Sequence, residues 1–156
     1  MSTGPSAIDN ISTLHFSPFI VAPYITAFYE MVEARPNNIL LSYLVLPLVL
    51  YPASRDKLKS SNIKSTIQSF LSQPNVQFGL GERVQEYKEI TNQSLIALLQ
   101  NSSLTVDDDL QVHLSNMKPD KSACSSISTN SAKNLGKILN KYDVISCYRA
   151  LGVKEL

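Results

Sequence analysis

Apolar residues in the first third of the chain recur at helical spacing. Side chains three or four positions apart predict a helix from about Pro23 to Ala34, which Arg35-Pro36-Asn37 ends. The next segment, Ile39 to Leu50, is apolar nearly all round, as expected where a segment is buried on every side. Helix and strand are both compatible with it. Its many leucines favour a helix, although Pro47 then requires a bend.

The middle of the chain alternates short apolar stripes with loop signals. Ser54 to Leu58 predicts a short helical turn, and Ile63 to Leu71 predicts a helix that ends at Pro74. Gly79-Leu80-Gly81 predicts a loop. From Glu82 to Gln100 one apolar stripe continues without interruption, so this segment is predicted to be the longest helix.

The last third begins with the alternation that is typical of strands. Residues 104–114 alternate apolar and polar positions on either side of Asp107-Asp108-Asp109, which predicts a β-hairpin. Residues 115–131 lack periodicity and predict a loop, and two helices are expected within 132–151, the second after the Asp143 cap. The predicted fold class is mainly α with a small β-hairpin, arranged as a winged-helix-like core plus C-terminal helices.

Length and composition refine the domain organisation. A chain of 156 residues suits one core. Residues 1–14 are polar and rich in Ser and Thr, so we expect a flexible N-terminal arm followed by a single helical domain from 15 to 156. The first residues lack a secretory signal, and the apolar run Ile39 to Tyr51 is shorter than a membrane span. A cytoplasmic protein without membrane contact is therefore expected.

Residues 44–58 carry the clearest resemblance to a known family. Leu44 to Tyr51, followed by Ser54 to Leu58, resembles the "LVLPLVLH...TR..L" block of middle components from three-component ABC ATPase systems of the Lamassu kind. Further elements follow in the family's order: Phe16-Ser17-Pro18-Phe19 ("NPAF"), Phe78-Gly79 with Arg83 ("GF..R"), Thr91 to Leu95 ("T.EAL"), Ala132 to Lys137 ("A..LGK") and Ala150 to Val153 ("LLGV"). The chain departs from the pattern at Ser17, at Tyr51 and at Asn92-Gln93-Ser94, so no particular polar contact carries over.

The resemblance implies a non-catalytic subunit. Such a subunit sits between a dimeric ABC ATPase, SMC-like or Rad50-like, and an effector that is often a nuclease, in defence against phage or plasmids. The family's ATP and nuclease chemistry belongs to those other chains. The candidate partner interface comprises apolar residues and two arginines at matched positions, namely Phe16, Pro18, Phe19, Leu44, Leu46, Pro47, Leu50, Arg55, Arg83 and Leu151. Arginines beside apolar surface are enriched at binding hot spots. Pairing of these two arginines with the chain's own carboxylates, such as Asp56 or Glu86, remains an equal alternative.

The sequence shows no pattern for catalysis or metal binding. The two histidines, His15 and His113, lack ligand spacing, and Asp107-Asp108-Asp109 lacks the glycine and distal glutamate of a calcium loop. Gly79-Leu80-Gly81 lacks the lysine of a phosphate-binding loop. Cys124 and Cys147 are interpreted as free thiols. We therefore expect no enzymatic activity, no metal and no cofactor.

The charge pattern keeps DNA as a second hypothesis. Fourteen basic and thirteen acidic residues give a formal charge of +1, which provides no overall attraction to nucleic acid. The predicted helix 82–100 is slightly acidic, so it is a poor recognition helix for DNA. Candidates for weak DNA-backbone contacts are Lys57, Lys59 and Lys64, or the loop lysines Lys118 and Lys121, with the DNA held by the assembled complex. A stand-alone winged-helix DNA-binding regulator is the alternative function.

Overall fold

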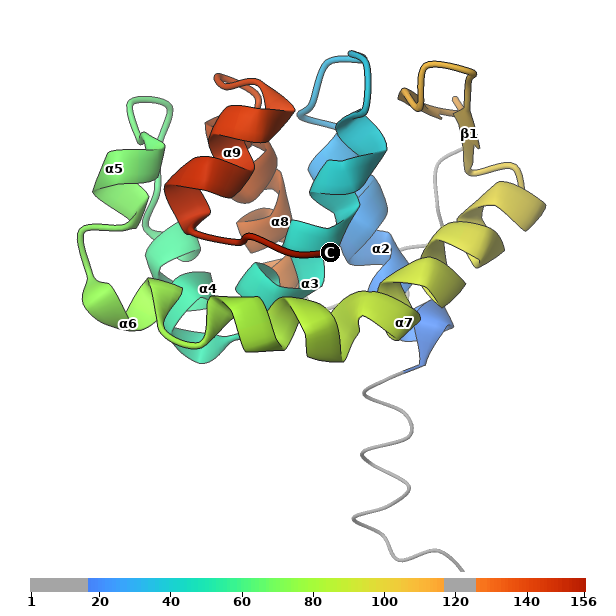
Figure 1. The fold of residues 1–156 in the computed structure, drawn as a ribbon. Helices are drawn as coiled ribbons and strands as arrows, with labels where there is room; N and C mark the ends of the chain where they lie inside the picture. The colour runs from blue at the N-terminus through green and yellow to red at the C-terminus, as the bar shows by residue number, and fades with distance from the viewer. Residues whose placement is uncertain (1–16, 117–125) are drawn as a thin grey trace, which may run out of the picture.

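Helices make up most of the protein, and one small hairpin accompanies them (Figure 1). The computed structural model describes residues 17–116 and 126–156, so the predicted N-terminal arm, His15, Phe16, Lys118, Lys121 and Cys124 lie outside the described residues. The first elements are α2 (Pro18–Tyr29), the 3-10 helix η1 (Asn38–Leu41), α3 (Ser42–Val49), α4 (Pro52–Lys59), α5 (Ile67–Phe70) and α6 (Pro74–Gln77). Then follow α7 (Leu80–Gln100), β1 (Leu104–Val106), β2 (Val112–Leu114), α8 (Ser126–Leu139) and α9 (Val144–Leu151). The predicted fold class, mainly α with a small hairpin, is confirmed.

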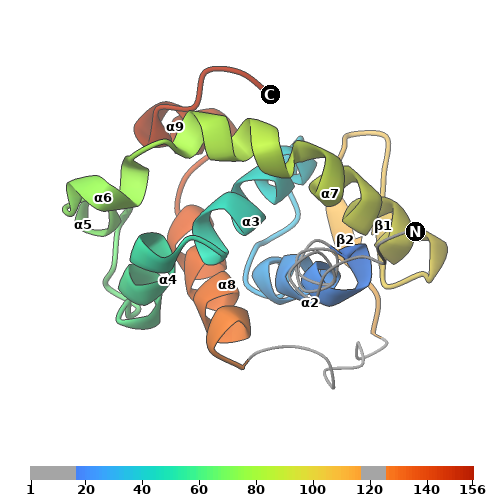
Figure 2. The ribbon, with the colours of Figure 1, turned by 90° about the horizontal axis from the view of Figure 1, so that it is seen from below.

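The core is built from three layers of helices. α2 and α3 form the central layer, α7 packs on one side of it, and α8 with α4 packs on the other (Figure 2). α3 is covered from both sides, and Leu44, Leu46 and Leu48 are each 0% exposed. This explains why residues 39–50 are apolar nearly all round, and it confirms the helix over the strand.

α2 starts and ends earlier than the sequence pattern predicted. Pro18 occupies the first helical position, where the missing N–H group has no intrahelical acceptor in any case. Pro23, predicted to begin the helix, lies inside it, and the Thr26 hydroxyl donates a hydrogen bond of 2.9 Å to the Pro23 carbonyl. The helix ends at Tyr29, whose hydroxyl donates to the Asn38 carbonyl at 2.7 Å.

The predicted helix from Ile63 to Leu71 is wrong at both ends. Only Ile67–Phe70 is helical, capped by reciprocal hydrogen bonds between Thr66 and Ser69, and Ile63 is 82% exposed in the preceding loop. Pro74 begins a further helix, α6, because proline is favoured at a first helical position.

The loop predicted for 115–131 is also corrected, because α8 begins at Ser126. Two serines lie on the buried side of its first turns, with Ser128 6% and Ser131 0% exposed. Farther along, a Cβ atom built on Gly136 would lie 2.5 Å from the Phe28 carbonyl oxygen. Gly136 therefore lets α8 approach α2 closely. The buried serines of the first turns are polar in sequence, so they hide the helical periodicity there from sequence analysis.

The hairpin forms as predicted and is fixed to the loop between α2 and η1. Leu104 pairs with Leu114 and Val106 with Val112 in an antiparallel register. The Asn38 side-chain oxygen accepts a hydrogen bond of 2.7 Å from the Val112 N–H group, and the Asn37 N–H group donates to Asp109 at 2.9 Å. β2 packs on α2 and β1 on α7, at one end of the helical layers.

Arg35 ties the same loop to the end of α8. Its guanidinium donates hydrogen bonds of 3.1 Å each to the carbonyls of Leu139 and Asn140. The last carbonyls of a helix have no intrahelical donor, so Arg35 caps α8.

Candidate partner interface

The apolar residues predicted at a partner interface divide into buried and exposed sets. Leu44 and Leu46 are 0% exposed, Leu151 is 1% exposed, and Pro47 is buried. These four side chains are buried within the chain itself, so a partner does not reach them in this conformation. The all-round apolar pattern that suggested an interface reflects burial in the chain's own core.

The remaining predicted residues lie at or near the surface. Phe19, in the first turn of α2, is 77% exposed, whereas Pro18 and Leu50 are half-buried. Arg55 on α4 is half-buried, and its guanidinium lies 3.9 Å from the Asp56 carboxylate in a weak ion pair. Phe19 is therefore the most accessible apolar member of the predicted set among the described residues.

Arg83 joins the ends of three segments. From α7 it donates hydrogen bonds to the Pro47 carbonyl of α3, at 3.3 Å, and to the Val76 carbonyl of α6, at 3.0 Å. Its guanidinium carbon lies 3.6 Å from the centre of the Tyr51 ring, as in a cation–π contact. Pro47 and Arg83 are thus two predicted site residues that the structure brings into direct contact.

The environment of Arg83 indicates a structural role. Burial of the guanidinium lowers the pKa of Arg83, and the nearby Tyr51 opposes that shift. Its Nε atom is buried and has no hydrogen-bond partner within the described part of the chain. In the described residues Arg83 contacts two carbonyls and an aromatic ring, and it forms no ion pair with the Glu86 carboxylate. Arg83 therefore links α7 to α6 and α3.

Exposed apolar side chains near the C-terminus were absent from the predicted interface. Ile145 on α9 is 69% exposed, Leu156 is 39% exposed, and Phe78, before α7, is 77% exposed. Gly79 follows Phe78 with a φ of 64°, a conformation that glycine adopts without strain. The Phe78-Gly79 pair belongs to the family resemblance, and that was the available signal for Phe78.

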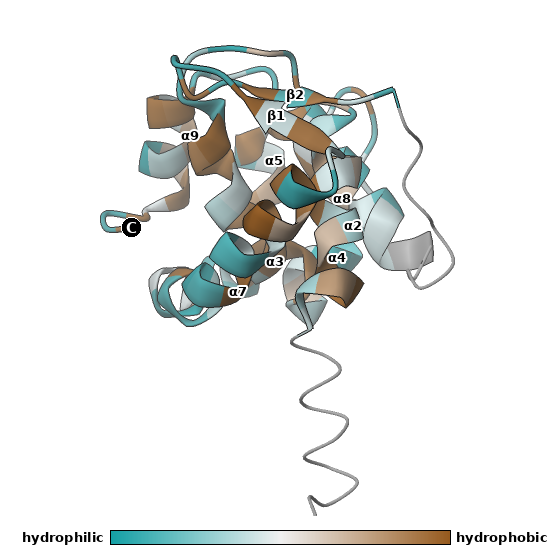
Figure 3. Cartoon of the chain, turned by 90° about the vertical axis from the view of Figure 1, so that its right-hand side faces the viewer, coloured by the Kyte–Doolittle hydropathy of each residue, from teal (hydrophilic) through white to brown (hydrophobic). Residues whose placement is uncertain are grey.

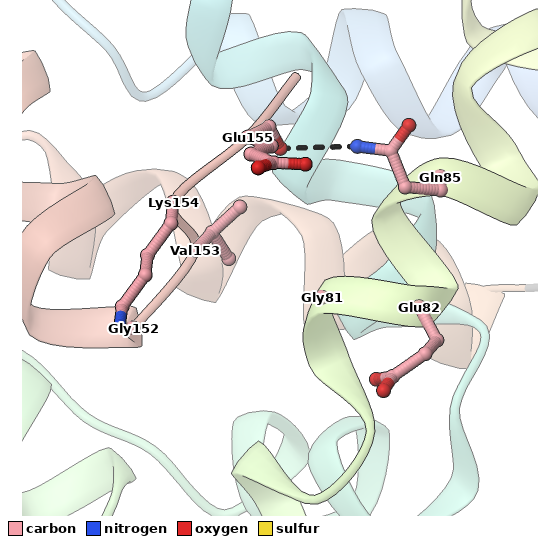
Figure 4. A pocket seen from close by; sticks show the side chains of 7 residues that line it. All are labelled: Gly81, Glu82, Gln85, Gly152, Val153, Lys154 and Glu155. Carbon is pink, nitrogen blue, oxygen red and sulfur yellow. Dashed lines mark hydrogen bonds between the residues drawn. The ribbon is translucent and has the colours of Figure 1, made fainter.

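Two hollows flank the C-terminal tail, residues 152–156, and together they form what we call the tail groove. One hollow, of about 400 Å³, is mainly apolar and is lined by Leu40, Val144, Ile145, Tyr148, Arg149 and Val153 to Leu156. The other, of about 350 Å³, is lined by Gly81, Glu82, Gln85 and Gly152 to Glu155 (Figure 4). The Gln85 side chain donates a hydrogen bond of 3.1 Å to the Glu155 carbonyl and so holds the tail between the hollows.

Charged and titratable groups lie at and near the tail groove. Its apolar lining is rimmed by both signs of charge, from Arg149, Lys154 and Glu155. The thiol of Cys147 lies on the buried side of α9, and burial raises the pKa of Cys147 to about 11. No group of three His, Cys, Asp or Glu side chains within residues 17–116 and 126–156 is arranged to hold a metal ion.

A family model decides where the chain belongs. The model of the ABC-three component (ABC-3C) system Middle Component 3 matches residues 5–155. The chain belongs to this family. No curated protein and no solved structure matches the chain. The middle component is therefore a subunit of a multi-component ABC ATPase system, and the resemblance seen at residues 44–58 is confirmed at the level of the family.

In this middle component the lysines predicted to touch DNA lie on or just after α4. Lys57 and Lys59 fall in its last turn, and Lys64 follows in the loop before α5. Lys59 and Lys64 are exposed, and Lys57 is half-buried. α4 lies in the layer opposite α7, the helix that the sequence analysis judged a poor recognition helix for DNA (Figure 2).

No single described helix is long and apolar enough to cross a bilayer. The consecutive helices Asn38–Val49 and Pro52–Lys59 together have the length and composition of a membrane span, but the chain bends by 101° between them.

Proposed function

We propose that the middle component is a non-catalytic, cytoplasmic adaptor in a defence system of the Lamassu kind. In this proposal it joins an SMC-like or Rad50-like ABC ATPase to an effector, often a nuclease. The observation that carries the proposal is the family match over residues 5–155. The sequence supports the non-catalytic part, because its histidines, cysteines and acidic residues lack the spacing of known catalytic or metal sites.

An adaptor needs two surfaces that can be occupied at the same time. The tail groove presents Ile145 beside an apolar hollow, and the first turn of α2 presents Phe19. α9 and the start of α2 lie apart in both views of the ribbon (Figures 1 and 2). Large apolar side chains exposed beside a hollow are typical of protein contacts. We assign one of these surfaces to the ATPase and the other to the effector.

Co-purification tests the proposal. The chain is expressed with the ATPase and the effector encoded beside it, and each partner is measured separately for the variants Ile145→Asp and Phe19→Asp. Ile96→Asp is the matched control, because Ile96 is 53% exposed on α7 and lies outside both surfaces. A charge at a binding hot spot weakens association by about 30-fold or more.

The expected result is that each variant loses a different partner, whereas the control keeps both. A monodisperse monomer that ignores both neighbouring proteins would contradict the adaptor. The winged-helix regulator makes a different prediction, namely tight and sequence-dependent binding of DNA by the isolated chain at near-physiological salt.

A further inference from the structure

Basic residues of the middle component are concentrated in two short segments. Residues 55–64 and 133–141 contain seven of the fourteen Lys and Arg residues but one of the thirteen Asp and Glu residues, Asp56. The two segments therefore carry a formal charge of +6, and the rest of the chain carries −5, since the total is +1. The small net charge conceals a strong local one.

The fold brings these two segments side by side. The Asn134 side chain donates a hydrogen bond of 2.9 Å to the Leu58 carbonyl. Farther along, the Lys141 amino group donates to the carbonyls of Ile63, at 2.8 Å, and Ser65, at 2.7 Å. α8 therefore follows α4 and the loop after it, so that Lys137 falls between these two attachment points. α4 and α8 also lie next to each other in Figure 2.

Most of these positive charges have no carboxylate partner. Lys133 pairs with Glu30 at 2.9 Å, and Arg55 approaches Asp56 at 3.9 Å. The remaining five lysines, which we call the basic ridge, are Lys57, Lys59, Lys64, Lys137 and Lys141. Within the residues that the structure describes, no carboxylate lies within 4.0 Å of their amino groups. Four of the five are exposed, and Lys57 is half-buried.

We infer that the basic ridge binds the phosphate backbone of double-stranded DNA. Lysines on flexible stems contact phosphates as point charges and do not read bases. The two segments contain no aromatic residue on which an unpaired base could stack, so a duplex is favoured over a single strand. The choice of DNA among polyanions rests on the proposed function, in which the effector is often a nuclease and therefore acts on nucleic acid.

Other occupants fit the ridge less well. Ile63 is exposed beside the lysines, but one isoleucine buries too little apolar surface to hold a protein on a membrane. An acidic protein surface would need apolar contacts at its centre, whereas Ile63 is the only large apolar side chain that the described ridge exposes.

The test compares two triple variants of the full chain that change the net charge equally. Lys59→Gln/Lys64→Gln/Lys137→Gln removes three ridge charges, and Lys88→Gln/Arg149→Gln/Lys154→Gln removes three charges elsewhere. Lys141 is kept, because it anchors the loop after α4. Binding of a labelled 30-base-pair duplex is measured from about 25 to 200 mM salt, together with thermal unfolding of each variant.

For the wild type we expect weak, sequence-independent binding whose logarithm falls with log salt with a slope of about −4. The ridge variant should show a slope smaller by about 1 for each lysine removed, and the control should keep the wild-type slope. Equal slopes in the two variants, or no binding by the wild type at low salt, would overturn the inference. So would binding of the wild type to anionic phosphatidylserine vesicles without binding to the duplex.

Co-purification of the ridge variant with the ATPase separates this inference from the proposed function. We expect the ridge variant to retain the ATPase. If it loses the ATPase and keeps its DNA binding, the ridge is a protein interface, and the inference fails while the adaptor stands. If no form of the chain binds the ATPase, the proposed function fails and the DNA result is judged separately.

Discussion

The two outer layers of the molecule differ in charge although they cover the same core. On one side α7 carries Glu82, Glu86 and Glu89 against Arg83 and Lys88, and Arg83 is already held by carbonyls. Figure 3 shows hydrophilic residues along the outside of this helix. On the other side α4 and α8 present the basic ridge. The net charge of +1 thus hides two faces of unlike charge, one slightly acidic and one strongly basic.

The difference also extends to how each side is attached to the core. α8 fits the central layer at Gly136, where the close approach of the Phe28 carbonyl leaves no room for a larger side chain. α7 is attached through the long, polar side chain of Arg83, which bridges to α3 and α6. The two faces should therefore respond to different substitutions.

Removing a side chain from the central layer should destabilise both sides of the molecule, and this is the largest expected effect on the free energy of unfolding. Leu44→Ala deletes a fully buried side chain in the central layer, which should lower the free energy of unfolding by about 2 to 5 kcal/mol. Urea unfolding at equilibrium measures the change. Leu50→Ala is the control, because Leu50 is half-buried. Equal losses in the two variants would contradict the layered core.

Gly136→Ala should disturb the packing of the side that carries the basic ridge more than that of the side that carries α7. The new Cβ would lie 2.5 Å from a backbone oxygen, and a backbone moves less readily than a side chain, so α8 should shift away from α2. We expect the variant to be destabilised by about 1 to 3 kcal/mol, the range for overpacking. Its salt slope for DNA binding should also fall, although no charge has changed. Gly81→Ala is the control, because no atom lies within 4 Å of its added Cβ.

Arg83→Met should destabilise the side of the molecule that carries α7, with a smaller loss in the free energy of unfolding. The substitution keeps an apolar stem but removes the donors to Pro47 and Val76, so we expect a loss of about 1 to 2 kcal/mol. Hydrogen exchange should rise at α6 and at the start of α7, and the basic ridge should keep its DNA affinity. Arg83→Lys should recover part of the stability, since one ammonium does not replace the planar fork. Unchanged exchange at α6 would argue against the bridging role.

The smallest effect concerns the start of α9 and depends on pH. The Asp143 carboxylate accepts hydrogen bonds from the Ser146 N–H and hydroxyl groups, and these lower the pKa of Asp143 from its ordinary value of about 3.8. A lowered pKa in the folded state means that the carboxylate stabilises the fold above pH 4 and that this contribution is lost as the pH falls through the lowered value. Asp143→Ala should therefore be less stable than wild type at pH 7, and the gap should narrow below pH 4. A gap that is constant with pH would contradict this role of the carboxylate.

Much of the fold could be predicted where one local pattern dominates. The stripe from Glu82 to Gln100, the hairpin alternation and the Asp143 cap each correspond to an observed element. The prediction failed where tertiary contacts override the local signal. Ser131 is a polar residue in sequence terms, yet it is fully buried against α4, where its hydroxyl donates to the Arg55 carbonyl at 3.3 Å.

The candidate sites were less predictable than the fold, for a related reason. An apolar run such as Leu44 to Leu50 looks the same in sequence whether its own chain or a partner buries it. Exposure depends on what packs nearby, which the local sequence does not show. No pattern marked Ile145 as exposed, and the apolar pattern that suggested an interface at Leu46 is equally typical of the core, where Leu46 lies. The sequence pattern indicated Lys57, Lys59 and Lys64 of the basic ridge but not Lys137 and Lys141, which are distant in sequence and join the ridge only because α8 packs on α4.

The cap that Arg35 places on α8 also bears on the timing of folding during synthesis. Arg35 and Asn140 are 105 positions apart, so the arginine emerges from the ribosome long before its acceptor exists. At synthesis rates of about 5 to 20 residues per second, roughly 5 to 20 s pass between the two. During that interval the face of α2 that α8 will cover is exposed to other chains. Nascent chains of this protein should therefore be most prone to aggregation just before the last two helices are made.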